Sequence, residues 1–142
     1  MEHVLSHELQ FDTIGLSFYP WWQGTIEDLI DNVERIANHY PSHEVVIAGT
    51  GFMFMECEGC KRGRQNPEEY QVSPQGQYAL LLELCSRLKR RSNVEGIYYW
   101  FPESIDAGDI GHLPYSLFLA NGTLLKGFEA FNDCQLCAEV EK

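Results

Sequence analysis

The sequence predicts an α/β domain built on a parallel sheet, and two observations support this fold class. Three short apolar segments, at 11–18, 44–48 and 96–100, have the length and composition of strands, and a helical segment lies between each consecutive pair. Helices of this length suit right-handed crossovers between parallel strands. Two architectures fit this order of elements: an open doubly wound sheet and a β/α barrel.

A proline and three aromatic residues follow the first strand, 11–18. Pro20 ends the strand, and we expect Tyr19, Trp21 and Trp22 to lie on a loop. Any one of these rings is readily explained as an apolar plug beneath a loop. Several rings together at the carboxyl end of a strand favour a stacking surface for a flat or ring-shaped ligand.

The first helix is predicted directly after this loop. Thr25 is an N-cap candidate, with Asp28 three residues further on. Apolar residues then recur at spacings of three and four as far as Tyr40, and the pattern ends before Pro41. This predicts an amphipathic helix with one buried face.

The second strand, 44–48, is apolar without alternation, as expected for a strand covered on both faces of a parallel sheet. It ends in the glycine-containing segment 49–51. A dinucleotide fingerprint would need a third glycine at Phe54 and a helix beginning there, and neither is present, so we exclude a nucleotide site of this kind. The long connection 52–72 has no sustained period, which is typical of a functional loop.

The second helix is predicted to begin with Ser73 as its cap and Pro74 in the first position. Its apolar body covers 79–88, and the basic residues of 87–91 lie at the negative end of the helix dipole.

The third strand, 96–100, also ends in aromatic residues. After it, 117–119 leads into an Asn121-Gly122 turn, and 124–131 is expected to form a short closing helix or an extended segment. All three predicted strands end in loops that carry aromatic residues, glycine or acids. A β/α barrel builds its catalytic face in this way, so this pattern favours the barrel.

Charge and hydropathy exclude some classes of partner. The net charge of -11 argues against nucleic acid and against an anionic membrane surface, because both would repel the chain. No segment has the length and apolarity of a transmembrane helix, and the first residues lack the pattern of a secretory signal. The sequence therefore predicts no location for the protein.

Five cysteines leave three interpretations open. Cys57 and Cys60 form one Cys-x-x-Cys pair, Cys134 and Cys137 form another, and Cys85 lies within a helical pattern. Free thiols or a local disulfide are the simplest interpretation. A structural zinc held by the four paired cysteines is the second, and it requires the fold to bring the two distant pairs together. Redox catalysis is disfavoured, because neither pair opens a helix.

Several segments resemble the arabinogalactan endo-β-1,4-galactanases of glycoside hydrolase family 53. The sixth strand of that family typically reads Asp-x-Ile-Gly-Leu-Ser-Tyr-Tyr-Pro, followed by Trp and a Gly-Thr helix start; residues 12–20, Trp22 and 24–25 match this almost position for position. Its eighth strand ends in Tyr-Trp-Glu-Pro, similar to 99–102 here, and 116–131 resembles its closing segment.

The resemblance implies the carboxyl-terminal portion, about strands six to eight, of a (β/α)8 TIM barrel. A complete barrel has eight units and roughly 250 residues, so we expect residues 1–142 to form a single partial domain, truncated on the amino-terminal side. Open strand edges would then permit self-association. The implied substrate is a galactan-type polysaccharide, with no cofactor, and members of the family are typically extracellular or attached to the cell surface.

The same resemblance assigns the site residues. Tyr19, Trp22 and Trp100 are expected to stack on galactose rings, and Gly49 occupies the position of the nucleophilic glutamate. A retaining glycosidase needs two carboxylates. The strand that carries the general acid/base in the family has no match here, so we expect the chain alone to be inactive. The alternatives are a non-catalytic carbohydrate-binding module or a zinc-stapled interaction module.

Overall fold

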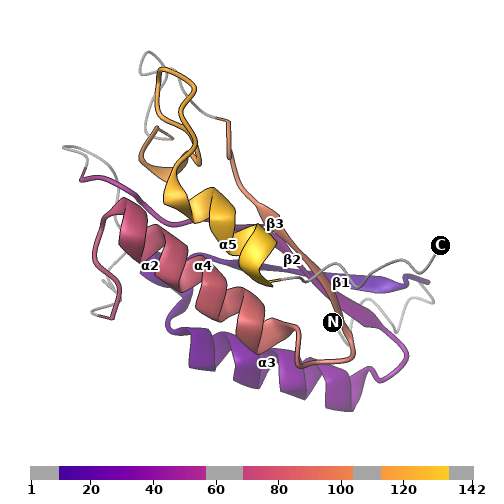
Figure 1. Ribbon diagram of the computed structural model, residues 1–142. Helices are drawn as coiled ribbons and strands as arrows, with labels where there is room; N and C mark the ends of the chain where they lie inside the picture. Colours follow the sequence, from indigo (N-terminus) through magenta and orange to yellow (C-terminus); the bar gives the residue numbers. More distant parts are fainter. Residues whose placement is uncertain (1–9, 57–68, 104–112, 135–142) are drawn as a thin grey trace.

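Three parallel strands form the centre of the protein. The computed structural model describes residues 10–56, 69–103 and 113–134. Its sheet has the order β1-β2-β3, with strands β1 (Thr13–Phe18), β2 (Glu44–Thr50) and β3 (Val94–Tyr99). All three strands run in the same direction, as predicted (Figure 1).

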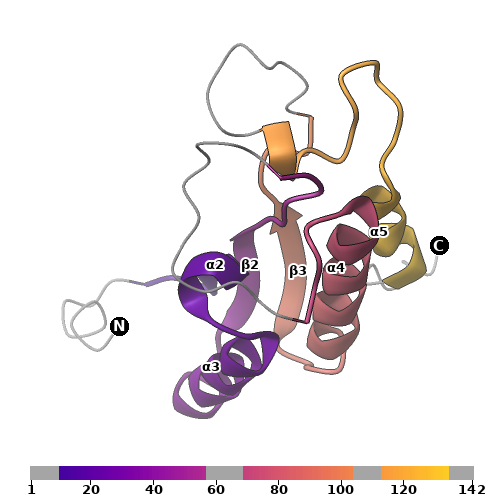
Figure 2. The same ribbon diagram turned by 90° about the vertical axis from the view of Figure 1, so that its left-hand side faces the viewer.

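The helices gather on one side of this sheet. Figures 1 and 2 show α3 and α4 packed along the strands and α5 lying beside α4. The helical segments are α2 (Pro20–Gln23), α3 (Ile26–His39), α4 (Pro74–Leu88), the 3₁₀ turns η1 (Leu113–Tyr115) and η2 (Lys126–Phe128), and α5 (Glu129–Cys134). No helix in the described ranges has the length and apolarity needed to cross a bilayer.

The predicted capping of α3 is confirmed. The Thr25 hydroxyl accepts a hydrogen bond from the Asp28 N–H at 3.1 Å, and the Asp28 carboxylate accepts one from the Thr25 N–H at 2.8 Å. The bond from the Thr25 N–H, and after it one that the Thr25 hydroxyl donates to the Asp28 carboxylate at 2.7 Å, lower the pKa of Asp28. The start of α3 is therefore fixed by two reciprocal contacts.

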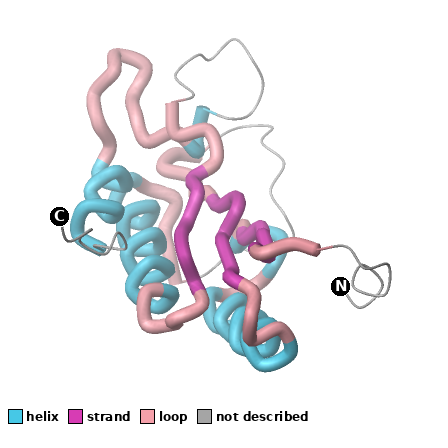
Figure 3. Tube along the Cα trace, turned by 90° about the vertical axis from the view of Figure 1, so that its right-hand side faces the viewer, coloured by secondary structure: helices cyan, strands magenta, loops and turns pink. Residues whose placement is uncertain are grey.

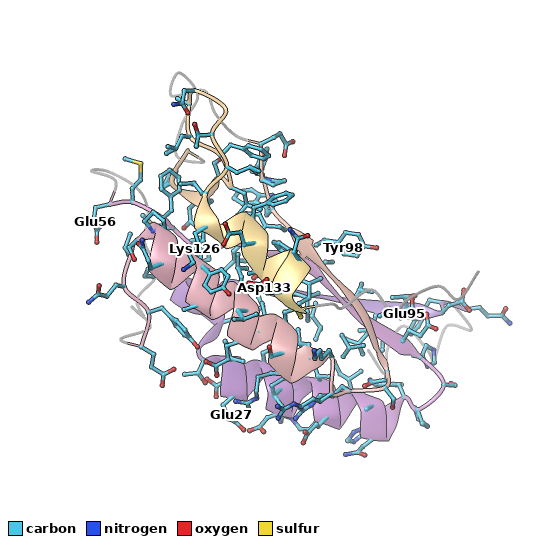
Figure 4. All side chains as sticks on the ribbon, in the orientation of Figure 1. Glu27, Glu56, Glu95, Tyr98, Lys126 and Asp133 are labelled. Atoms are coloured by element: carbon cyan, nitrogen blue, oxygen red, sulfur yellow. A yellow bond between two sulfur atoms is a disulfide. The ribbon has the colours of Figure 1, made fainter. Side chains whose placement is uncertain are left out.

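The core lies between the sheet and the two long helices. Val33 of α3, Ile47 of β2, and Leu80, Leu84 and Leu88 of α4 are all completely buried. The basic residues at the end of α4 do more than face the helix dipole. Their side chains reach α3, where Arg87 pairs with Glu27 (labelled in Figure 4) and Arg91 pairs with Glu34 at 2.6 Å.

Among the described residues no helix or strand covers the opposite face of the sheet, which corrects the prediction that β2 is covered on both sides. Val45 and Ile47 are buried against the helices, whereas Ala48 is exposed. Figure 4 shows Tyr98 of β3 pointing away from the helices. In the described part of the chain no further strand pairs with the outer edge of β1 or β3. Self-association through these edges stays a prediction.

Two carboxylates meet on the open face and make stability depend on pH. A hydrogen bond that the protonated Glu44 carboxyl donates to the Glu95 carboxylate raises the pKa of Glu44 above its usual value of 4.5, and desolvation and the negative charges of Glu95 and Asp12 add to this shift. A raised carboxyl pKa in the folded state stabilises the protein at acid pH, and this contribution is lost as the pH rises through the raised pKa.

We therefore expect Glu44→Gln to raise stability near neutral pH relative to the unmodified chain and to flatten the decline in stability above a pH of roughly 4.5. Urea midpoints measured from acid to neutral pH test this. The matched control is Asp31→Asn, which removes an exposed acid from α3. Equal pH profiles for Glu44→Gln and Asp31→Asn would contradict the coupling.

The structure corrects the cysteine assignment. Cys134, at the end of α5, forms a disulfide with Cys85 of α4, with a Cα–Cα distance of 5.9 Å. The two helices lie side by side, and the contact buries both residues. Cys134 is therefore not available to a zinc site, and the disulfide is not local. Cys57, Cys60 and Cys137 lie outside the described residues.

The closing segment follows the predicted order. Phe118 and Leu124 form an antiparallel bridge around the turn at Asn121-Gly122, where Gly122 adopts a positive φ of 82°. The chain then enters η2 and α5. The predicted segment 124–131 is thus extended at Leu124 and helical from Lys126 onward, where Ala130 and Phe131 pack against the core that includes α4.

Candidate carbohydrate-binding face

The candidate site lies at the carboxyl ends of the strands. Tyr19 follows β1, Gly49 lies near the end of β2, and Trp100 follows β3. Because the strands are parallel, their carboxyl ends emerge at the same edge of the sheet, and Figure 3 shows the loops gathered there. The structure thus brings together residues that are far apart in the sequence.

A short helix after β1 divides the aromatic cluster into a buried and an exposed part. Pro20 and the next three residues form α2, where we had expected a loop, because proline suits the first turn of a helix. The helical turn directs Trp21 inward, where it is 1% exposed and stacks on Phe52 with ring centroids 5.1 Å apart. Trp22 points outward and is 51% exposed.

Tyr19 is the centre of the exposed cluster. Its ring contacts Trp22 at a centroid distance of 5.5 Å and Trp100 at 5.9 Å, both in edge-to-face geometry. Trp100 in turn contacts Phe101 at 4.4 Å and Tyr115 at 6.4 Å. In edge-to-face contacts the rings do not share a plane, so the cluster presents ring faces in several orientations rather than one flat stacking surface.

Phe101 has an unusual backbone conformation. Its φ of 54° lies in the left-handed region, although it is not glycine and it precedes Pro102. Such conformations cost free energy and concentrate at functional sites. Here the bend ends β3 and lets the Trp100 and Phe101 rings pack against each other. Sequence patterns gave no signal for it.

Gly49 lies beside Tyr19. The register between β1 and β2 skips Ala48, so that Ser17 pairs with Gly49 directly after Leu16 pairs with Ile47. A bulge of this kind re-aims the chain at the end of a strand. A Cβ at position 49 would lie 2.9 Å from the Tyr19 hydroxyl oxygen, so a side chain there would displace that hydroxyl.

The Tyr19 hydroxyl is not a substitute nucleophile. Partial burial raises its pKa, which keeps the phenol protonated and weakly nucleophilic at neutral pH. Glu56 and Glu103, the acids on the neighbouring loops, are both exposed. Figure 4 shows Glu56 on the outer side of the segment that follows β2. The described residues therefore place no carboxylate at the end of β2.

Sequence reasoning missed one residue beneath the site. Gln77 of α4 is completely buried and contacts the loops that follow β2 and β3. A signal for it exists: Gln77 continues the apolar series Leu81, Leu84 and Leu88 at spacings of four and three, so that a polar side chain falls on the buried face of the helix. In the ranges that the structure describes, no cluster of His, Cys, Asp or Glu side chains has the arrangement of a metal site.

Comparison of the sequence with known proteins identifies its family. The family model "Glycosyl hydrolase family 53" matches residues 1–135. An endo-beta-1,4-galactanase of Bacillus subtilis is 26% identical over 113 residues, and an arabinogalactan endo-beta-1,4-galactanase of Cellvibrio japonicus is 30% identical over 100 residues. The matches cover 75% and 66% of this chain, but only 26% of each relative.

Solved structures support the fold. A fungal beta-1,4-galactanase superposes with a TM-score of 0.71 at 24% identity, covering 86% of this chain and 38% of that enzyme. A xylanase of Cellvibrio japonicus superposes with a TM-score of 0.64 at 14% identity, covering 96% and 43%. Three parallel strands with their crossover helices thus correspond to a portion of a (β/α)8 barrel, and the chain belongs to glycoside hydrolase family 53.

Proposed function

We propose that residues 1–142 form the carboxyl-terminal part of a retaining endo-β-1,4-galactanase barrel. In this role Tyr19, Trp22 and Trp100 bind galactose units of β-1,4-galactan or arabinogalactan, and the chain alone does not hydrolyse them. The galactanases among its relatives act as much longer chains, of which this one spans about a quarter.

The observation that carries the binding role is the aromatic cluster around Tyr19. Trp22 and Trp100 remain 51% and 37% exposed although each lies within 6 Å of Tyr19. Exposed rings held in a fixed arrangement at the carboxyl ends of barrel strands are suited to the apolar faces of sugar rings. Neutral galactose units also avoid repulsion from a chain of net charge -11.

The expected absence of hydrolysis follows from the lack of a carboxylate side chain at position 49. A retaining mechanism needs a carboxylate nucleophile about 5 Å from a carboxylic acid, on opposite sides of the scissile bond. Gly49 offers no carboxylate, and Tyr19 lies against the space that a side chain would enter. Without the nucleophile no glycosyl-enzyme intermediate forms.

Two measurements on the isolated chain test the proposal. With β-1,4-galactan we expect no release of reducing ends under conditions in which the Bacillus subtilis relative releases them. With β-1,4-galacto-oligosaccharides we expect calorimetric heat that Trp100→Ala weakens about tenfold or more, because a central aromatic anchor contributes a large part of binding. The matched control is Tyr98→Ala, which removes an aromatic ring that is 62% exposed and belongs to the open sheet face.

Two outcomes would contradict the proposal. Release of reducing ends that Trp100→Ala leaves intact would mean that another part of the chain carries the chemistry. Equal loss of binding in Trp100→Ala and Tyr98→Ala would mean that the aromatic cluster is not the binding surface.

A non-catalytic carbohydrate-binding module is the second candidate, and Gly49 is the observation that favours it. The two candidates differ in affinity. A partial cleft loses most of its contacts with a polysaccharide, so a fragment should bind galactan weakly. A dedicated module should instead bind galactan tightly without the rest of a barrel. A chimera separates them, in which residues 10–134 replace the matching segment of the Bacillus subtilis relative. The fragment proposal expects Gly49→Glu to restore hydrolysis in that chimera.

A further inference from the structure

Gln77 lies beneath the aromatic cluster without belonging to it. It follows Ser73, the N-cap of α4, by one helical turn, and its side chain is completely buried. A buried amide needs hydrogen-bond partners to offset its desolvation. Among the described residues, the side-chain amide of Gln77 finds its partners in Tyr99 at the end of β3 and in the segments after β2 and β3, and none in its own helix.

The Gln77 amide nitrogen holds these segments together. Nε2 lies 2.9 Å from the carbonyl oxygen of Phe52, 3.1 Å from that of Ser116 and 3.1 Å from the Tyr99 hydroxyl. A longer contact of 3.4 Å reaches the carbonyl oxygen of Tyr115. An amide has two hydrogens, so these acceptors share them.

Tyr99 completes the network. Its hydroxyl donates to the carbonyl oxygen of Tyr115 at 2.5 Å and accepts from the Phe52 N–H at 3.3 Å. Burial raises the pKa of Tyr99, so the hydroxyl stays protonated and able to donate. The loops after β2 and β3 and the segment before Leu117 are thereby fastened to one another through Gln77 and Tyr99.

The segments that Gln77 and Tyr99 join by hydrogen bonds either contain Trp100 or contact it. The N–H of Trp100 donates to the carbonyl oxygen of Thr50 at 2.8 Å. Pro102, two residues beyond Trp100, accepts from the N–H of Leu117 at 2.8 Å and from the hydroxyl of Ser116 at 3.0 Å. Tyr115 lies against the Trp100 ring. A shift at Gln77 therefore reaches Trp100 through both Tyr115 and Ser116.

The chemistry of the position requires an amide. Three carbonyl oxygens face Nε2. A carboxylate at this position would be repelled by them, and an apolar side chain would leave these acceptors without the Nε2 donor. The other side, Oε1, has no hydrogen-bond partner among the described residues and lies against Gly127, where a Cβ would approach it to 2.3 Å. The amide is therefore confined from both sides.

We infer that Gln77 is a positioning residue for the sugar-binding rings: it sets the orientation of Trp100 relative to Tyr19 and Tyr115 by holding the loops after β2 and β3 together. The inference rests on the proposed function, because it assigns Gln77 a part in galactan binding. Its structural part, that Gln77 sets the orientation of Trp100, is open to a separate measurement.

The test uses the full chain with Gln77→Met, which keeps the size of the side chain and removes the donor. The first readout is the NMR signal of the Trp100 indole N–H, assigned by its loss in Trp100→Phe; we expect Gln77→Met to shift it. The second is the affinity for β-1,4-galacto-oligosaccharide, which we expect to fall about tenfold. Tyr99→Phe, which removes a single hydroxyl from the network, should shift the same signal to a smaller extent.

The matched control is Val33→Ala, which removes apolar volume from the core on α3. We expect it to lower the melting temperature while the Trp100 signal and the affinity stay unchanged, which separates positioning from general destabilisation. An unchanged Trp100 signal in both Gln77→Met and Tyr99→Phe overturns the inference. Should Gln77→Met not fold, Tyr99→Phe decides alone. Absence of binding by the unmodified chain counts against the proposed function, and the Trp100 signal still decides the role of Gln77.

Discussion

Trp21→Ala is expected to lower the free energy of unfolding by about 3–5 kcal/mol, the range for removing a large buried aromatic side chain. Trp21 is 1% exposed and stacks on Phe52, so its removal leaves a cavity between α2 and the loop after β2. The neighbouring residue provides the control. Trp22→Ala removes the same side chain from an exposed position, and we expect it to change stability by no more than about 0.5 kcal/mol.

Urea unfolding of the two variants measures this difference, and calorimetry with galacto-oligosaccharide gives its functional counterpart. Trp22→Ala should weaken binding while stability is kept. A loss of stability in Trp22→Ala that equals the loss in Trp21→Ala would mean that α2 does not direct the two rings to opposite sides.

Replacing Cys85 and Cys134 together by serine is expected to destabilise the folded chain by about 2–4 kcal/mol. The disulfide closes a loop with a sequence separation of 49, which restricts the unfolded chain, and both residues are buried between α4 and α5. The measurement is urea unfolding with and without a reductant.

The reductant should destabilise the unmodified chain and leave the double variant unchanged. A triple variant with serine at Cys57, Cys60 and Cys137 is the control, because it keeps only the Cys85–Cys134 pair. If this control responded less to the reductant than the unmodified chain, the stabilising bond would involve one of those three cysteines instead.

The sequence predicted the elements whose signals are local. The period of the first helix and its Thr25 cap are contained within a few consecutive residues, and the structure confirms both. The Ser73 cap and Pro74 of α4 are confirmed in the same way. Tyr19, Trp22 and Trp100 were recognisable as a possible surface because each follows a strand.

Features that depend on distant parts of the chain could not be predicted. Trp21 and Trp22 are the same residue type, and only the turn of α2 against Phe52 decides which of them is buried. Cys134 belongs to a Cys-x-x-Cys pair in the sequence, yet the packing of α5 on α4 joins it to Cys85. The partners of Gln77 come from loops that a helical pattern does not reveal.

The parallel sheet also determines how the chain must fold. Each strand pairs with a partner that lies beyond a whole helix in the sequence: Thr13 pairs with Glu44, and Val45 pairs with Val94. No hairpin is available as a local nucleus within this sheet, so each strand pairing must wait for the closure of a long loop. We therefore expect refolding to be slow. Helices α3 and α4 should form early and expose their apolar faces until the strands pair. Because exposed apolar faces aggregate, the yield of refolding should fall as the protein concentration rises.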